Sequence, residues 1–224
     1  MKVEVLFSKN GFLALNKPSG MCVDNLQGGH TTHVPQLGEM IAERYKMGRF
    51  AHRIDRFTSG LNLAGVSESQ VRYLMSNWHQ ITKKYYLAII PNPTWENTIV
   101  NTPVNDGQSA KTEFKVLERL CSFALVQCQL IKSGRTHQIR QHLQSIGSSI
   151  LGDVKYGGQK VNAREGQLLH AWRIEFKLPG NCAWTSVQAA IPSDFKEFNF
   201  PWDRWDYNAN KALATWEVPT NWRR

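Results

Sequence analysis

Two short segments contain the residue types that could carry out chemistry. In the first, residues 52–61, Arg53 and Asp55 stand two positions apart. Alternate side chains of an extended chain share one face, so this pair would project together while Ile54 packs on the other side. A carboxylate beside arginines stays ionised, which makes Asp55 available as a nucleophile or a base. An ordinary surface ion pair would give the same pattern.

The second segment, residues 134–143, is predicted to begin a helix. Gly134 marks a turn, Thr136 is a candidate N-cap, and the helix is expected over residues 136–146 with Ile139 and Leu143 facing inward. Arg140 then lies beside the apolar stripe near the helix start, where a partly buried guanidinium needs an acceptor such as a carboxylate from elsewhere in the chain. A solvated basic face that touches RNA phosphates is the simpler alternative.

The elements that must position these segments are mainly strands. Alternation and dense apolar runs predict strands at residues 3–7, 12–15, 85–90, 112–116, 122–130, 169–178 and 183–191, with a turn at Asn10-Gly11 between the first two. Many strands with few helices between them indicate an α+β domain, with a mixed, mostly antiparallel central sheet and flanking helices.

Two further helices are predicted from their apolar stripes. The first covers residues 35–46, and the second covers residues 68–80 with Ser67 and Gln70 as a capping box. The expected inward side chains are Leu37, Met40, Ile41 and Tyr45 in the first helix and Val71, Leu74, Met75 and Trp78 in the second.

The composition favours a folded protein with a polyanionic partner. Hydrophobic residues make up 42% of the 224 positions, enough to build a sizeable core. Lys and Arg number 27 against 18 Asp and Glu, for a net charge of +9, and each basic residue set against a phosphate releases counterions. Many basic proteins bind no nucleic acid, so charge alone makes RNA only the favoured partner.

Other features narrow the class of protein. The four cysteines include no CxxC pair, so buried free thiols are expected rather than a zinc site or a disulfide framework. No leader pattern opens the chain, and no apolar run approaches the roughly 18 residues of a membrane span. We therefore expect a cytoplasmic protein with no membrane contact.

Together the two segments resemble a known enzyme family. Residues 52–61, HRIDRFTSGL, are similar to the HRLDxxTSGL signature of RluA-type pseudouridine synthases, and residues 134–143, GRTHQIRQHL, to the family's GRTHQIRxHL segment. Five further stretches follow in the family's order: LNKPSG at 15–20, KYYLA at 84–88, AKTEF at 110–114, ILGD at 150–153 with Tyr156, and LLHA at 168–171. Seven matches in one order make the resemblance specific. The sequence departs from the family at Asn62 and at Ser148-Ser149, where His-Pro is usual.

Carried over position by position, the resemblance implies roles. Asp55 stands at the catalytic aspartate, and Tyr86 at the tyrosine that packs on the target base and is a candidate proton acceptor. Arg140 stands at the arginine that pairs with the catalytic carboxylate, and Arg53 at the one that helps hold the flipped-out state. The neighbouring side chains expected to contact RNA are His52, Arg135, Thr136 and His137.

The implied reaction isomerises uridine to pseudouridine in structured RNA, either rRNA or tRNA. The base must leave C1′ through N1, turn and rejoin through C5, after the target nucleotide has flipped out of its helix. The resemblance implies no metal, no organic cofactor and no obligatory protein partner. It suggests a pseudouridine synthase catalytic domain over residues 1–199, with an RNA stem-loop as the expected substrate. A monomer is the default expectation.

The last residues differ in composition from this domain. Residues 200–224 hold Trp202, Trp205, Trp216 and Trp222, half of the eight tryptophans. We predict a tail that packs back onto the domain through these rings. A stacking surface for RNA is the alternative, because Arg and Lys residues lie nearby.

Two rival functions stay open from the residues. A catalytically inactive RNA-binding protein would show damage at the acidic and tyrosine positions, which are intact here. A histidine-based hydrolase or nuclease could use His52, His137 and His142, but His137 and His142 are five positions apart, not the three or four that place two side chains on one helix face. His170 is expected to be structural.

Overall fold

The computed structural model describes residues 2–23, 36–132, 134–161 and 164–218. Within them, eleven strands form one sheet. The strands are β1 (Lys2–Lys9), β2 (Phe12–Lys17), β3 (Arg49–Phe50), β4 (Ser59–Gly65), β5 (Thr82–Pro91), β6 (Asn97–Val100), β7 (Lys111–Arg119), β8 (Phe123–Lys132), β9 (Leu169–Lys177), β10 (Trp184–Gln188) and β11 (Ala214–Glu217). The helices are α1 (Leu37–Arg44), α2 (Glu68–Ile81), α3 (Gln138–Ser145), the 3-10 turn η1 (Val154–Tyr156), α4 (Ser193–Lys196) and α5 (Asp203–Asp206).

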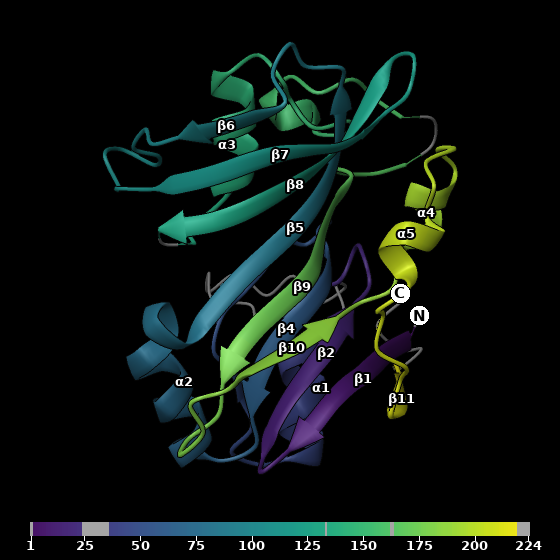
Figure 1. The fold of residues 1–224 in the computed structure, drawn as a ribbon. Coiled ribbons are helices and arrows are strands. Elements are labelled where there is room, and N and C mark those ends of the chain that lie inside the picture. The colour runs from purple at the N-terminus through teal and green to yellow at the C-terminus, as the bar shows by residue number, and fades with distance from the viewer. Residues whose placement is uncertain (1, 24–35, 133, 162–163, 219–224) are drawn as a thin grey trace.

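The sheet runs in the order β11-β1-β2-β4-β9-β5-β8-β7-β6, with β3 paired to β4 and β10 to β9. All pairs are antiparallel except β4 with β9, which pair in parallel over only two positions. The long strand β5 joins the half formed by β6, β7 and β8 to the half that contains β4 and β9 (Figure 1). This arrangement confirms the predicted α+β class with a mixed, mostly antiparallel sheet.

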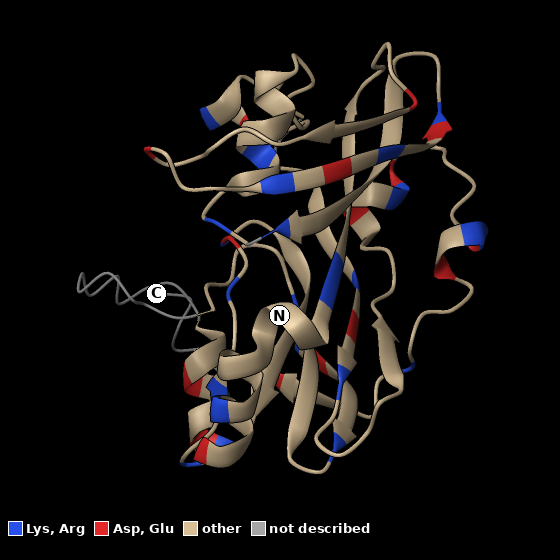
Figure 2. Ribbon diagram, turned by 60° about the vertical axis from the view of Figure 1, so that its left-hand side comes forward, with Lys and Arg blue, Asp and Glu red and all other residues tan. Residues whose placement is uncertain are grey.

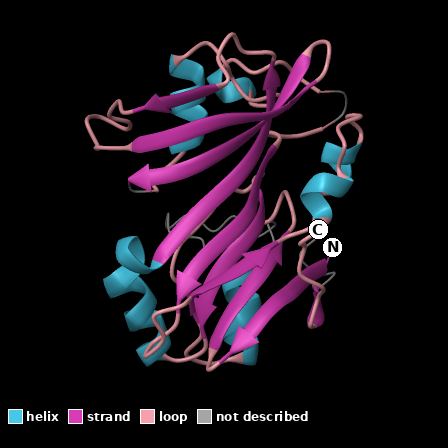
Figure 3. Cartoon of the chain, in the orientation of Figure 1, coloured by secondary structure: helices cyan, strands magenta, loops and turns pink. Residues whose placement is uncertain are grey.

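Helices cover both faces of the sheet (Figure 3). On β2, Leu13 and Leu15 belong to the larger core cluster, and the alternating Phe12 and Ala14 to the smaller one, because successive strand residues point to opposite faces. Helices α1 and α3 bury their apolar sides in the larger cluster, whereas α2 buries its side in the smaller one. The predicted turn between β1 and β2 is present, with Asn10 at φ 51° and Gly11 at φ 77°.

Several details of the predicted helices are wrong. Helix α1 is shorter than residues 35–46, Pro35 lies outside the described residues, and Tyr45 follows the helix with its side chain exposed. In α2, Met75 is 61% exposed, because Leu74 and Ile81 rather than Met75 face the sheet. Ser67 contacts the Gln70 side chain and caps no backbone amide.

The C-terminal segment meets the core at several points. Trp216 lies on β11, pairs with Val3 of β1 and is 9% exposed, while Trp202 and Trp205 pack against the larger cluster. Strand β11 was not among the predicted strands, and Trp222 lies outside the described residues. The division at residue 199 stays a prediction.

Charge and cysteine exposure complete the outline. Basic positions are spread over both halves of the sheet with acidic ones among them (Figure 2). Cys128 is buried as expected, but Cys121 and Cys182 are exposed, because they lie in turns at strand ends. Among the described helices, none has both the length and the apolar character required to cross a bilayer.

Candidate active site

The segment that carries Asp55 is a tight turn leading into β4. The Thr58 amide donates to the Asp55 carbonyl at 3.0 Å, which closes a four-residue turn. Strand β4 then begins beside β9, where Gly60 pairs with Ala171. Gly60 has φ +106°, and a Cβ there would lie 2.3 Å from the Ala171 carbonyl oxygen. Glycine is therefore required for the close parallel contact that fixes the turn at the centre of the sheet.

A second loop holds the Asp55 turn from behind. The fully buried Lys17, at the end of β2, donates through Nζ to the carbonyls of Pro18, Met21 and Arg56 at 2.7–3.0 Å. Burial lowers the pKa of Lys17 to about 7. Ser19 Oγ also donates to a carbonyl of the Asp55 turn. The stretch resembling NKPxG thus anchors the residues next to Asp55, a role that sequence reasoning did not assign.

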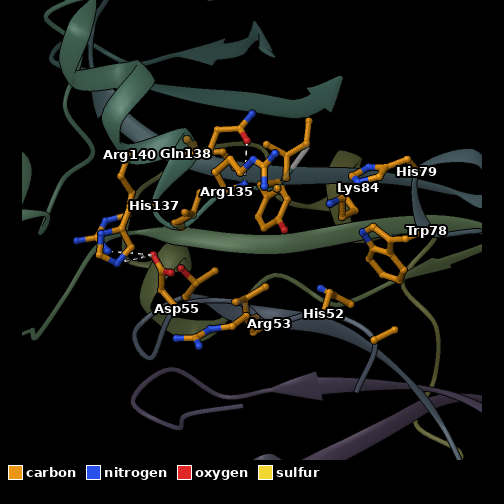
Figure 4. Close-up of a pocket in the computed structure, with 18 residues that line it drawn as sticks. His52, Arg53, Asp55, Trp78, His79, Lys84, Arg135, His137, Gln138 and Arg140 are labelled. Atoms are coloured by element: carbon orange, nitrogen blue, oxygen red, sulfur yellow. Dashed lines mark hydrogen bonds and ion pairs between the residues drawn. The ribbon is translucent and has the colours of Figure 1, made fainter. Parts of the chain in front are cut away.

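Arg140 joins two carboxylates that are distant in sequence. Its NH1 donates to Asp55 Oδ2 at 2.9 Å, while Nε and NH2 donate to the two oxygens of Asp153 at 2.6 and 2.7 Å (Figure 4 shows the Asp55 side). The Asp153 side chain is 1% exposed and that of Asp55 is 24% exposed. Burial acts to lower the pKa of Arg140, but the hydrogen bonds to Asp153 outweigh it and the pKa is raised. The guanidinium is a permanent charge that holds Asp55 Oδ2 in a fixed orientation.

Asp153 is a site residue that sequence reasoning quoted in the ILGD match without assigning it a role. Its position depends on Gly152, which has φ +81° and whose Cβ would lie 2.2 Å from the Gly166 carbonyl oxygen. The available signal in the sequence was an aspartate directly after a glycine in the ILGD match, together with an arginine of the predicted helix that needed an acceptor. The prediction named one carboxylate acceptor for Arg140, and the structure provides two, Asp55 and Asp153.

Tyr86 on β5 faces Asp55 across the cavity. Its side chain is 7% exposed, and burial, followed by the nearby Asp55 charge, raises its pKa. The hydroxyl therefore remains protonated at neutral pH. A phenol in this state packs on a base and donates a hydrogen bond more readily than it accepts a proton, which favours the packing role among those implied by the resemblance.

The expected RNA contacts occupy different environments. Arg53, Arg135 and Thr136 are exposed at the rim. His52 instead turns inward, accepts the Leu63 amide through Nε2 at 3.0 Å, and has a pKa lowered to about 3 by burial. The prediction of Thr136 as N-cap is wrong, because α3 begins one residue later.

His137 is the residue that precedes α3, in the left-handed region at φ 57°. Its Nδ1 lies 2.8 Å from the Tyr156 hydroxyl, and its Nε2 lies 3.7 Å from Asp55 Oδ2. The pKa of His137 is lowered by partial burial. His137 and Tyr156 thus flank Asp55 on the side of η1.

The histidines do not form a common centre. His142 is buried and contacts Thr112 Oγ1 at 2.8 Å and the Thr102 carbonyl at 3.0 Å. Because His52, His137 and His142 each engage different partners, the geometry does not support the histidine-based hydrolase. His170 is buried against Ser59 Oγ at 2.9 Å, as a structural residue would be. The described residues contain no cluster of three metal-ligating side chains.

A cavity of about 280 Å³ opens between the Asp55 turn, β5 and α3. This volume is near the lower end of small-ligand pockets, roughly 300 Å³ and above. Its apolar wall consists of Ile54, Leu130, Ile139 and Leu169. Asp55, Tyr86 and Arg140 all line it, so the structure brings the three predicted catalytic residues together.

Comparison with known proteins agrees with this geometry. The family model described as RNA pseudouridylate synthase matches residues 11–145. The ribosomal large subunit pseudouridine synthase C of Vibrio parahaemolyticus is 33% identical, over 86% of this chain and 67% of that protein. The uncharacterized RNA pseudouridine synthase YlyB of Bacillus subtilis is 33% identical, over 88% of this chain and 72% of its own length.

Solved structures show the same fold. Human RNA pseudouridylate synthase domain containing 4 superposes with a TM-score of 0.69 at 24% identity, over 86% of this chain and 90% of that chain. With the family match and the relatives above, the fold, the motifs and the site agree. The chain therefore belongs to the RNA pseudouridylate synthase family and is an RNA pseudouridine synthase of the RluA type.

Proposed function

We propose that this enzyme isomerises one or a few uridines of ribosomal RNA, with Asp55 as the catalytic carboxylate and the target nucleotide flipped into the cavity. The observation that supports this proposal most directly is that the two carboxylate oxygens of Asp55 differ in their hydrogen bonding. Oδ2 is held by Arg140, whereas Oδ1 has no hydrogen-bond partner within the described part of the chain. An ionised, oriented oxygen that is free at the cavity wall is what nucleophilic or basic attack on a nucleoside requires.

The cavity supports flipping of the base. It has the size for one nucleoside, and a base stacked within a helix could not reach Asp55 at its wall. Extrusion costs a few kcal/mol, which contacts with the displaced nucleotide must offset. In this proposal the uracil ring packs on Tyr86 while the apolar side chains exclude water from the detached base.

The chemistry begins from the same oxygen by each route considered for such an enzyme. Attack at C1′ or C6 and proton abstraction from C2′ all need an ionised carboxylate beside the sugar and base. The N1–C1′ bond breaks, the C5–C1′ bond forms, and the C5 proton is lost while N1 gains one. Arg140 and the buried Asp153 behind it keep the carboxylate in place through these steps.

Exposed basic residues surround the opening and support an RNA track. A second hollow on the other side of Asp55 shares Arg53, His137 and Arg140 with the cavity and adds Arg56 and Lys155. Phosphate contacts from such residues would orient the strand without reading its sequence. Several relatives are named for the ribosomal large subunit, which favours its rRNA over tRNA as the substrate.

The test is to map pseudouridine by a carbodiimide-based readout in rRNA and tRNA from cells with and without the gene. We expect one or a few rRNA sites to disappear and to return with wild type but not with Asp55→Asn. The matched control is Asp203→Asn, which changes an exposed aspartate of α5 and should restore every site. Restoration by Asp55→Asn would remove Asp55 from its role, and loss confined to tRNA would replace the proposed substrate.

A further inference from the structure

Lys84 on β5 is a buried lysine that finds no hydrogen-bond acceptor among the described residues. Its side chain is 7% exposed, and burial lowers its pKa to about 8. Its nearest described partner is the Trp78 ring, whose centroid lies 5.3 Å from Nζ. Among the described residues, no hydrogen bond and no ion pair has Lys84 Nζ as its donor. Lys17 provides the contrast, because its fully buried ammonium donates to three carbonyls.

The ammonium of Lys84 faces the active-site cavity. Lys84 and Tyr86 alternate along β5 and both line the cavity, at a separation of about 6.6 Å along the strand. Figure 4 shows Lys84 with Trp78 and His79 at the end of the cavity away from Asp55. On the facing loop, a Cβ at Gly134 would lie 2.7 Å from Lys84 Nζ, so the glycine leaves the ammonium uncovered.

This end of the cavity suits an anion. The imidazole of His79 lies beside Lys84 there, Arg135 lines the same cavity, and the lining contains no carboxylate except Asp55, which Arg140 holds. The Trp78 ring lies against His52, with ring centroids 4.7 Å apart and an interplanar angle of 31°. A desolvated ammonium gains most from a charged acceptor, and the anions of an RNA substrate are its phosphates.

We propose that Lys84, supported by Trp78 and exposed to the cavity by Gly134, binds the backbone phosphate that adjoins the flipped uridine. The spacing from Tyr86 to Lys84 places this phosphate about one nucleotide step from the base. The subsite holds the sugar over Asp55, so that flipping is completed by a charged contact deep in the cavity. This inference rests on the proposed flipping of uridine onto Tyr86.

The experiment measures binding of a stem-loop transcript that contains the mapped uridine, in the Asp55→Asn background so that no turnover is needed. Lys84→Met should raise Kd roughly 10- to 100-fold. It should also flatten the slope of log Kd against log salt by about 0.7, the contribution of one single-strand phosphate. The matched control is Lys83→Met, on the opposite face of β5 beside Glu175 at 3.8 Å, which should leave both quantities nearly unchanged.

Neutral phosphates supply the decisive comparison. In the protein that retains Lys84 (the Lys84 protein), a methylphosphonate on one side of the target uridine should weaken binding by a similar factor. In Lys84→Met, the same modified transcript should bind as tightly as the unmodified one. Equal losses in both proteins, or no loss in either at both flanking positions, would overturn the phosphate assignment. The methylphosphonate series on the Lys84 protein needs no variant at Lys84, so a folding defect in Lys84→Met would not spoil the test. This experiment measures only binding, so its outcome does not depend on the role of Asp55. If Asp55→Asn isomerised uridine, the proposed catalysis would be contradicted, but the phosphate assignment would still be judged by the binding data.

Discussion

Arg140 holds two aspartates, and the same substitution at each should lower the free energy of unfolding by very different amounts. Asp153→Asn is nearly isosteric, but it replaces a carboxylate oxygen with an amide N–H₂ that faces the donors of Arg140. The Asp153 side chain is 1% exposed and accepts two of the three Arg140 hydrogen bonds. Breaking a buried ion pair by removing one partner costs about 3–5 kcal/mol. For a domain of this size the melting temperature should fall by roughly 6–20 °C.

Asp55→Asn is the matched counterpart on the same guanidinium. Its side chain is 24% exposed and accepts one hydrogen bond, and Arg140 keeps its two bonds to Asp153. Water replaces much of the lost contact, so the cost to the free energy of unfolding should stay below about 1 kcal/mol. Isomerisation should nevertheless be abolished, whereas RNA binding should remain.

The assay is thermal and urea unfolding together with single-turnover isomerisation of the mapped transcript. Asp153→Asn should lower kcat at least about 100-fold, since a displaced Arg140 no longer orients Asp55. Adding Arg140→Gln should recover part of the stability but none of the activity, because the unpaired buried charge is then gone. Wild-type melting of Asp153→Asn, or equal destabilisation by Asp55→Asn, would refute this division of roles.

Three further changes test the site and its frame. Tyr86→Phe keeps the ring that packs on the base and loses one hydrogen bond, so kcat should fall by no more than about tenfold. Because the pKa of Tyr86 is raised, wild-type kcat should not fall from phenol ionisation as pH rises from 7 to 9, and a fall that Tyr86→Phe abolishes would contradict this. Gly60→Ala should cost more than about 3 kcal/mol because its Cβ would meet the Ala171 carbonyl, whereas Gly107→Ala, at φ +96° with open space around it, should cost about 1–2 kcal/mol; equal melting temperatures would remove the close approach as the reason for glycine. The pKa of His170 is about 3 in the folded state and about 6.5 unfolded, so the unfolded chain binds more protons between these values and stability falls as pH falls; from pH 7.5 to 5.5 the loss should be about 1.4 kcal/mol for this residue, and urea unfolding of His170→Gln should show that much less pH dependence.

The elements were predictable where local signals are strong. Alternation predicted the strand from Thr112, and a dense apolar run predicted the strand from Tyr85, which is buried on both faces. Asn10-Gly11 marked its turn because both residues adopt positive φ. Strand β11 was not predictable, since its four residues carry no alternation and gain their order from pairing with β1. Met75 was misplaced because helix periodicity alone does not fix which of two adjacent apolar residues faces the sheet.

The catalytic residues were predictable as a set but not as a network. Up to 85 positions separate Asp55, Tyr86 and Arg140 in the sequence. Only the family motifs predicted that these three residues lie close together. Asp153 and Lys84 were hidden for a physical reason: burial, not residue type, gives them their roles. Sequence shows a lysine in a strand, whereas the absence of an acceptor around Lys84 appears only once β5, α2 and the loop at Gly134 are assembled.

Burial also supports the proposal that Asp55, and not Asp153, carries out the chemistry, although both contact Arg140. Both oxygens of Asp153 accept hydrogen bonds from Arg140 and the side chain is 1% exposed, so it has neither a free oxygen nor access to substrate. In Asp55, Oδ2 accepts from Arg140, whereas Oδ1 has no hydrogen-bond partner among the described residues, and the residue lines the cavity. A carboxylate whose hydrogen bonds are saturated acts as a counter-charge, and one that is half-satisfied can act on a ligand. This criterion supports the proposed reactive role of Asp55 without reference to any relative.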